Sequence, residues 1–181
     1  EHESDFRQAH ARAAEYYVRP LRSRDSSGFN SRLVNSFAEA RYHLYHAGRH
    51  EELRQLLVQM LDVALAEMNS TSPVPNHPEV LDERIGILTI LLENQAHGGL
   101  HYYMARCLRA RRKTGDLNKA IEHALKATEG RRAPADSWVL LAQLLEQSGN
   151  KARAIDSIDK ALDSVPMQDK RFALYHYGAA L

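Results

Sequence analysis

A period of 34 residues in the second half of the chain constrains its fold more than any other feature. One glycine pair and two alanine pairs share this spacing: Gly115 with Gly149, Ala120 with Ala154, and Ala127 with Ala161. A fixed period of this length is typical of stacked helical hairpins. Alanine lets two helix backbones approach closely, and glycine tolerates the positive φ at which many helices end. The spacing therefore predicts repeated helix pairs, each closed by a glycine turn.

The stretch from residue 135 to residue 166 is the best-formed repeat. It carries a bulky aromatic residue, a Leu-small pair, a turn glycine, two alanines and a final proline, namely Trp138, Leu141, Ala142, Leu145, Gly149, Ala154, Ile158, Ala161 and Pro166. This order resembles the tetratricopeptide repeat family, with Ala142, Leu145 and Ile158 departing from the family's usual Gly, Tyr and aromatic residues. The resemblance implies an all-α superhelix, a solenoid of antiparallel helix hairpins with a peptide-binding concave groove.

The resemblance also divides the chain. Residues 101–134 form a weaker repeat, residues 135–168 the clear one, and residues 169–181 a partial third, within a segment that runs from 78 to 181. Residues 1–77 read as degenerate helical hairpins that end in a proline-rich loop at 69–77. We expect one continuous solenoid domain, as a fragment of a longer protein.

Local signals set the expected helix boundaries. A helix over 4–18 should end at Arg19-Pro20, because the residue before a proline avoids helical geometry. Helices should also run from about 31 to Ala47, from 50 to 68, and from Pro78 to a break at 97–99. Residues 85–93 are apolar on all sides, which indicates burial between helices or a partner surface.

A second resemblance covers about residues 5–60. His10, Ala13, Tyr16 and Tyr17 precede Tyr42, His43, Leu44, Ala47 and Gly48 in an arrangement similar to the helical arm that follows the ATPase core in signal-transduction ATPases with numerous domains. The resemblance implies that this chain is part of the sensor or scaffold arm of a larger signalling ATPase. Self-association would then occur through the parent protein.

Composition excludes several classes of protein. Lys and Arg number 24 against 23 acidic residues, so no global charge attracts the chain to nucleic acid or to a membrane. No apolar run could span a bilayer, and no signal peptide is apparent. A single cysteine indicates a reducing compartment, and we expect a cytoplasmic location.

No catalytic motif occurs, so we expect neither an enzyme nor a cofactor. Cys107 reads as an inert buried thiol. His43, His46 and His50 have spacings that could meet on a helix, but Gly48 interrupts that helix and no further ligand completes a metal site.

A basic stripe on the helix at 101–113 is the candidate binding site. The family's groove positions, together with this stripe, give the predicted groove residues: Tyr102, Arg106, Arg109, Arg112, Lys113, Gln143, Glu146 and Tyr177. Arginine forms bidentate pairs with carboxylates, which favours an acidic peptide. Ala105 and Val139 stand where chaperone-binding members carry a carboxylate clamp. The opposing interpretation is that the arginines form a solvated or inter-repeat face.

The preferred hypothesis is therefore a non-enzymatic protein-protein interaction module that binds a protein or peptide in its concave groove. The alternative is a structural spacer or oligomerisation arm. A helical repeat that contacts nucleic acid is a third and weaker hypothesis, because the stripe has few aromatic residues.

Overall fold

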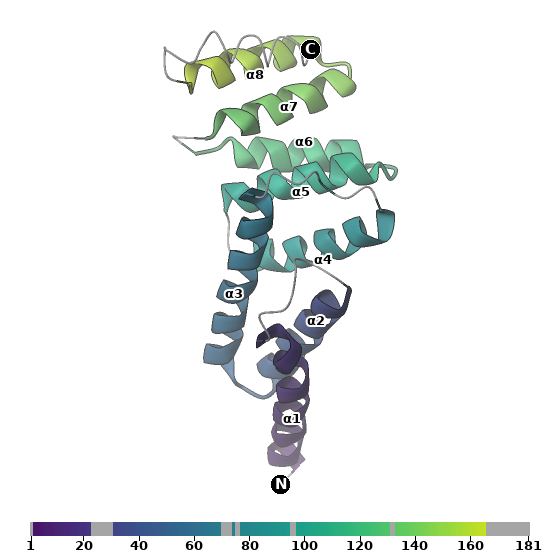
Figure 1. The fold of residues 1–181 in the computed structure, drawn as a ribbon, viewed down its shortest axis with the longest axis vertical. Coiled ribbons are helices and arrows are strands. Elements are labelled where there is room, and N and C mark those ends of the chain that lie inside the picture. The colour runs from purple at the N-terminus through teal and green to yellow at the C-terminus, as the bar shows by residue number, and fades with distance from the viewer. Residues whose placement is uncertain are drawn as a thin grey trace. The chain divides into compact units, whose positions relative to one another are not determined.

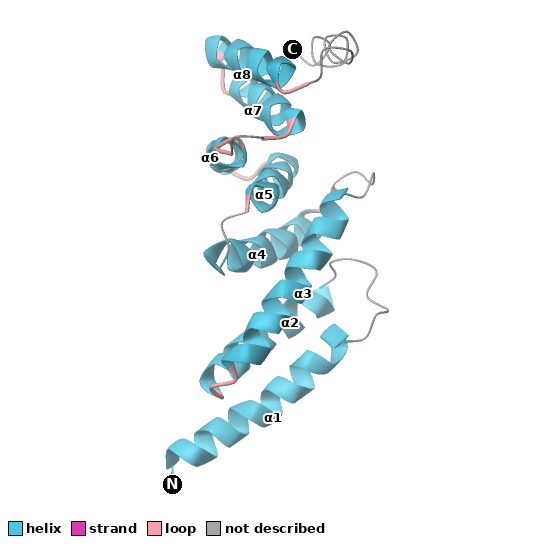
Figure 2. Cartoon of the chain, turned by 90° about the vertical axis from the view of Figure 1, so that its left-hand side faces the viewer, coloured by secondary structure: helices cyan, strands magenta, loops and turns pink. Residues whose placement is uncertain are grey.

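The computed structural model describes residues 2–22, 31–69, 74, 77–94, 97–130 and 133–165. Within these residues the chain consists of eight helices and no strand. Figures 1 and 2 show how the helices of each unit are arranged. The all-α prediction is confirmed. The helices form two compact units, Glu1–Pro73 with His77–Asn94 and Val74–Asn76 with Gln95–Leu181. The single continuous solenoid stays a prediction.

The first unit contains α1 (His2–Arg22), α2 (Ser31–His46), α3 (His50–Asn69) and α4 (Pro78–Asn94). The rings of Phe6 and His46 and those of His10 and His43 meet across α1 and α2, so the two helices run antiparallel. Buried apolar side chains of these two helices include Ala14, Phe37, Ala40 and Leu44, each at most 1% exposed. The small alanines among them allow helices to approach closely.

Helix α4 contacts α2 and α3 within this unit. Four of its apolar side chains are at most 3% exposed: Leu81, Ile87, Leu88 and Leu91. Burial of this kind accounts for the high apolar content of residues 85–93.

The prediction that α1 ends at Arg19-Pro20 is wrong. The helix continues through Pro20 to Arg22. Val18 and Leu21 are both buried, so continuing the helix keeps one apolar face on the core. The carbonyl of Leu21 also accepts a 3.0 Å hydrogen bond from Gln59 Nε2 on α3, which satisfies a group left unpaired at the helix end.

The second unit stacks α5 (Gly98–Arg111), α6 (Asp116–Ala127), α7 (Ala135–Gln147) and α8 (Lys151–Asp163), as Figure 2 shows. Helices α5 and α6 form one hairpin, and α7 and α8 form the next. Helix α7 also contacts both α5 and α6, so the two hairpins pack directly against each other. This arrangement is the expected helical repeat.

The periodic residues occupy the positions that their chemistry requires. Gly115 and Gly149 adopt φ values of 84° and 82° in equivalent hairpin turns, a conformation in which a Cβ is strained. The periodic alanines at 120, 127, 154 and 161 are all at most 5% exposed, as close packing of helices requires. The predicted glycine turns are confirmed.

The start of α5 differs from the expectation that residues 97–99 only break a helix. His97 is the N-cap of α5, and its Nδ1 accepts a 3.1 Å hydrogen bond from the Gly99 amide. Gly98 and Gly99 lie in the first turn of the new helix. The side-chain acceptor satisfies one of the free amides of that turn and compensates for the poor helix propensity of glycine.

Candidate functional site

A pocket of about 270 Å³ opens in the second unit between the end of α5, the α5–α6 turn and the end of α7. We call it the α5–α7 pocket. Its walls combine two leucines with basic and polar side chains, namely Leu108, Leu117, Arg109, Arg112, Lys113, Asp116 and Gln147. Three of the predicted groove residues, Arg109, Arg112 and Lys113, therefore line one concave feature.

Arg109 contacts the neighbouring repeat through its side chain. Its guanidinium donates a hydrogen bond to Oε1 of Gln143, which lies one repeat further along the chain. Burial, followed by the nearby charge of Arg112, lowers the pKa of the Arg109 guanidinium from its usual range. The hydrogen bond joins two predicted groove residues on α5 and α7, so both side chains face the same side of the stack.

Arg112 and Lys113 reach the α5–α7 pocket from outside the helix. Helix α5 ends at Arg111, and Arg112 adopts a left-handed conformation with φ 57° while its amide donates to the carbonyl of Leu108. The predicted stripe along one helix face therefore extends only to Arg109. Arg112 and Lys113 are exposed, and they belong to the turn that precedes α6.

The other predicted groove residues lie elsewhere on the second unit. The guanidinium of Arg106 stands 5.7 Å from the centre of the Tyr102 ring, one helical turn earlier, in a cation–π contact. Glu146 is half-buried on α7, and Ala105 is fully buried. Tyr177 lies outside the residues that the structure describes, as does the partial repeat at 169–181.

Sequence reasoning missed the pair that shapes this turn. Arg111 donates to both carboxylate oxygens of Asp116, at 2.9 and 2.6 Å, and the Lys113 amide donates to the same carboxylate at 2.8 Å. The hydrogen bonds from Arg111 hold the pKa of the Asp116 carboxyl below its usual range. Asp116 is 2% exposed. The only sequence signal was an acidic residue directly after the turn glycine.

Histidines form two cross-helix pairs that local spacing could not reveal. His10 and His43 approach to 2.7 Å between their Nδ1 atoms, and His101 and His123 approach to 2.9 Å. His46 lies beside His10, whereas His50 follows the Gly48 turn and contacts Tyr45. Within the described residues, no three histidine, cysteine or acidic side chains are grouped so that they could hold a metal ion.

Two further findings concern the described part of the chain. Cys107 is fully buried on α5, as its position in the repeat predicted. Among the described helices, none has the length and apolar character needed to cross a lipid bilayer.

Comparison with known proteins adds one relationship. Searches of curated proteins and of solved structures found no match to this chain. The hairpin of α7 and α8 does match a family: residues 135–164 fit the model of the tetratricopeptide repeat, a protein-interaction module.

Proposed function

We propose that the unit formed by α5 to α8 is a non-enzymatic module that binds an acidic segment of a partner protein in its groove. The observation that carries this proposal is the hydrogen bond from Arg109 to Gln143, which places equivalent residues of successive repeats on one face. Because the first helix of each repeat supplies these residues, an extended peptide could contact both repeats at once.

The charge of the α5–α7 pocket supports an acidic ligand. Asp116 is the one carboxylate that lines it, and Arg111 already occupies both oxygens of that group. The guanidinium of Arg109 donates its hydrogen bond to the neutral side-chain amide of Gln143, which does not compensate the positive charge. An uncompensated guanidinium favours carboxylate ligands. Leu108 and Leu117 offer an apolar wall beside this charge.

A packed stack of hairpins also keeps the groove in place before the ligand arrives. The core of α5 and α7 is fully buried at Leu100, Cys107, Leu141 and Leu144. Little conformational entropy is then lost from the protein on binding, and the free energy of the charge contacts is retained as affinity.

Charge reversal tests the proposal. We expect Arg109→Glu with Arg112→Glu to weaken binding of a fluorescein-labelled acidic peptide, DELAEDELAE, by about tenfold or more, measured by anisotropy. The amide peptide NQLAQNQLAQ should bind neither protein. Arg153→Glu, an exposed arginine on α8, is the matched control. Unchanged affinity in the double variant, with helical content retained, would exclude the groove.

The parent protein is a second part of the proposal. We infer a sensor or scaffold arm of a signalling ATPase, because residues of the two N-terminal motifs contact one another: His10 pairs with His43, and Tyr17 stacks on His43 at 5.6 Å with the rings 6° from parallel. The test is nucleotide binding by the longer protein, measured with and without its segment preceding residue 1. A parent protein that binds no nucleotide contradicts this context.

Self-association is the alternative function, and exposed aromatic side chains favour it. Phe6, Tyr42 and Tyr45 of the first unit are each more than half exposed. Light scattering at increasing protein concentration decides between the two functions. A monomer at all concentrations argues against an oligomerisation arm.

A further inference from the structure

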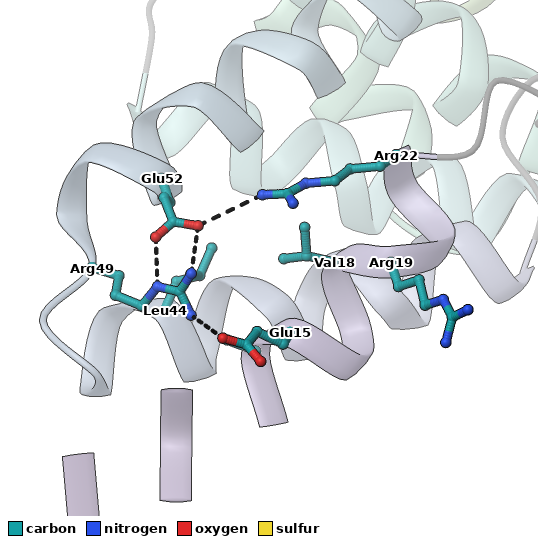
Figure 3. A pocket seen from close by; sticks show the side chains of 8 residues that line it. Glu15, Val18, Arg19, Arg22, Leu44, Arg49 and Glu52 are labelled. Atoms are coloured by element: carbon teal, nitrogen blue, oxygen red, sulfur yellow. Dashed lines mark hydrogen bonds and ion pairs between the residues drawn. The ribbon is translucent and has the colours of Figure 1, made fainter. Parts of the chain in front are cut away.

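A second pocket, in the first unit, has no role in the function proposed above. It measures about 240 Å³ and lies between the C-terminal half of α1, the end of α2 and the start of α3. Its lining consists of three buried apolar side chains and five charged ones, namely Ala14, Val18, Leu44, Glu15, Arg19, Arg22, Arg49 and Glu52. We call it the α1–α3 pocket, and Figure 3 shows its side chains.

The floor of the α1–α3 pocket is apolar, because residues one helical turn apart lie on the same face of a helix and here this face is buried. Ala14 and Val18 are one turn apart on the buried face of α1, and Leu44 meets them from α2. The exposed fractions of these side chains are 0%, 9% and 1%. The volume is below the range of about 300–1,000 Å³ usual for drug-sized ligands. The pocket therefore suits one apolar side chain better than a cofactor.

The rim of the pocket contains a network of ion pairs centred on Arg49. Arg49 donates to both oxygens of Glu52, at 2.5 and 2.7 Å, and to Glu15 at 3.4 Å, as Figure 3 shows. The hydrogen bonds that Arg49 donates to Glu52 raise the pKa of the Arg49 guanidinium. This network joins α1 to the start of α3, and it uses both carboxylates that line the pocket.

Two arginines of the rim, Arg19 and Arg22, are exposed to solvent. Arg22 forms an ion pair with Glu52 at 3.6 Å, which is longer than a hydrogen bond, and its side chain is 68% exposed. Arg19 makes no ion pair with any residue that the structure describes, and its guanidinium is directed away from the network in Figure 3. The spacing of Glu15, Arg19 and Arg22 places all three on one face of α1.

We propose that the α1–α3 pocket is a second docking site, which takes an acidic partner segment carrying a large apolar side chain. The apolar side chain enters the pocket over Val18 and Leu44, and carboxylates on either side of it in the segment are bound by Arg19 and by Arg22. Charge complementarity identifies this occupant, since three arginines line the pocket against two glutamates that are already paired. Guanidinium groups favour a carboxylate by bidentate hydrogen bonding.

The experiment measures peptide binding in the Arg109→Glu, Arg112→Glu background, so that the α5–α7 pocket does not contribute. The fluorescein-labelled peptides are DELFED, its amide counterpart NQLFQN and its small-residue counterpart DEAAED. We expect saturable binding of DELFED alone. In isotope-labelled protein, the methyl signals of Val18 and Leu44 should shift with the same saturation curve.

Variants of the rim make the assignment specific. Adding Arg19→Glu with Arg22→Glu should weaken DELFED binding by about tenfold or more, whereas Arg12→Glu, an exposed arginine on the same helix, should leave it unchanged. Val18→Phe should block the pocket while the rim charges stay. Circular dichroism shows whether each variant retains its helices.

Four results of the peptide experiments overturn the proposal. They are no saturation with DELFED up to about 1 mM, equal binding of the amide peptide, equal binding of the small-residue peptide, and methyl shifts away from Val18 and Leu44. A concentration-dependent dimer that the Arg19 and Arg22 variants dissociate identifies a second copy as the occupant and also overturns it. None of these results bears on the α5–α7 pocket, whose own variants are tested separately.

Discussion

Arg109 and Gln143 are 34 residues apart, one repeat period, and the guanidinium of the first donates a hydrogen bond to the side-chain carbonyl of the second. The hydrogen bond connects α5 to α7, the first helices of successive hairpins. It therefore contributes both to the packing of the two repeats and to the orientation of the basic group that faces the α5–α7 pocket.

Removing the acceptor should weaken this connection. We expect Gln143→Ala to lower the free energy of unfolding by about 1 kcal/mol, because hydrogen bonds to charged groups contribute about 1.5–3 kcal/mol and this one is only half-buried. Chemical denaturation measures the change. Gln147→Ala, one turn later and exposed, is the control.

A double-mutant cycle with Arg109→Met isolates the pair from its surroundings. The coupling energy should be about 0.5 kcal/mol or more. Additive effects of the two substitutions would mean that the hydrogen bond does not form in solution.

The buried pair of Arg111 and Asp116 should contribute more to stability. We expect Asp116→Asn to lower the free energy of unfolding by about 3 kcal/mol. Arg111 would keep its charge but lose its bidentate carboxylate partner, and residue 116 is only 2% exposed. Asp156→Asn removes an exposed carboxylate from a pair with Lys160 and should cost about 0.5 kcal/mol or less. Equal costs for the two variants would contradict the structural role of the buried pair.

The parts of the fold that follow from local sterics were predictable from sequence. The periodic glycines and alanines identify the turns and the close helix contacts, because both depend on the absence of a larger side chain at fixed spacing. The 34-residue period could also have paired Arg109 with Gln143. By contrast, the left-handed conformation of Arg112 was not predicted. It arises because α5 ends at Arg111, which pairs with Asp116 at the start of α6.

Contacts between distant segments were not predictable in the same way. The proline at position 20 signals a helix end. The hydrogen bond that favours the longer helix comes from Gln59, which is 38 residues after its acceptor, Leu21. The pairing of His10 with His43 has the same cause, since 33 residues separate the two rings and only the packing of α1 on α2 brings them together. The α1–α3 pocket could not be predicted for the same reason, because its lining side chains come from three parts of the chain that meet only in the folded unit.

The last turn of α1 offers a direct test of that long-range contact. Gln59→Ala leaves the Leu21 carbonyl without its donor, so we expect the turn from Val18 to Arg22 to lose protection against amide hydrogen exchange. The global free energy of unfolding should fall by about 1 kcal/mol. Gln55→Ala, one turn earlier on α3 and exposed, is the control. Unaltered exchange in this turn would show that burial of Leu21 alone holds the helix.

The pairing of His101 with His123 should make the second unit sensitive to acid. Burial, with the nearby charges of His101 and Lys126, lowers the pKa of His123 from 6.5 to about 4, and burial also lowers the pKa of His101. As the pH falls below 6.5, the unfolded chain therefore binds protons that the folded chain does not, and stability decreases. The decrease should continue to pH about 4, where folded His123 also becomes protonated.

Thermal unfolding between pH 7.5 and pH 4 measures this loss. His123→Gln should flatten the dependence of the melting temperature on pH, because the substituted side chain carries no titrating group. His50→Gln, on an exposed residue outside the pair, should leave the wild-type slope intact. Asp116 contributes little in this interval, since its lowered carboxyl pKa makes its stabilisation disappear only at lower pH. The same slope in wild type and His123→Gln would show that another group causes the acid sensitivity.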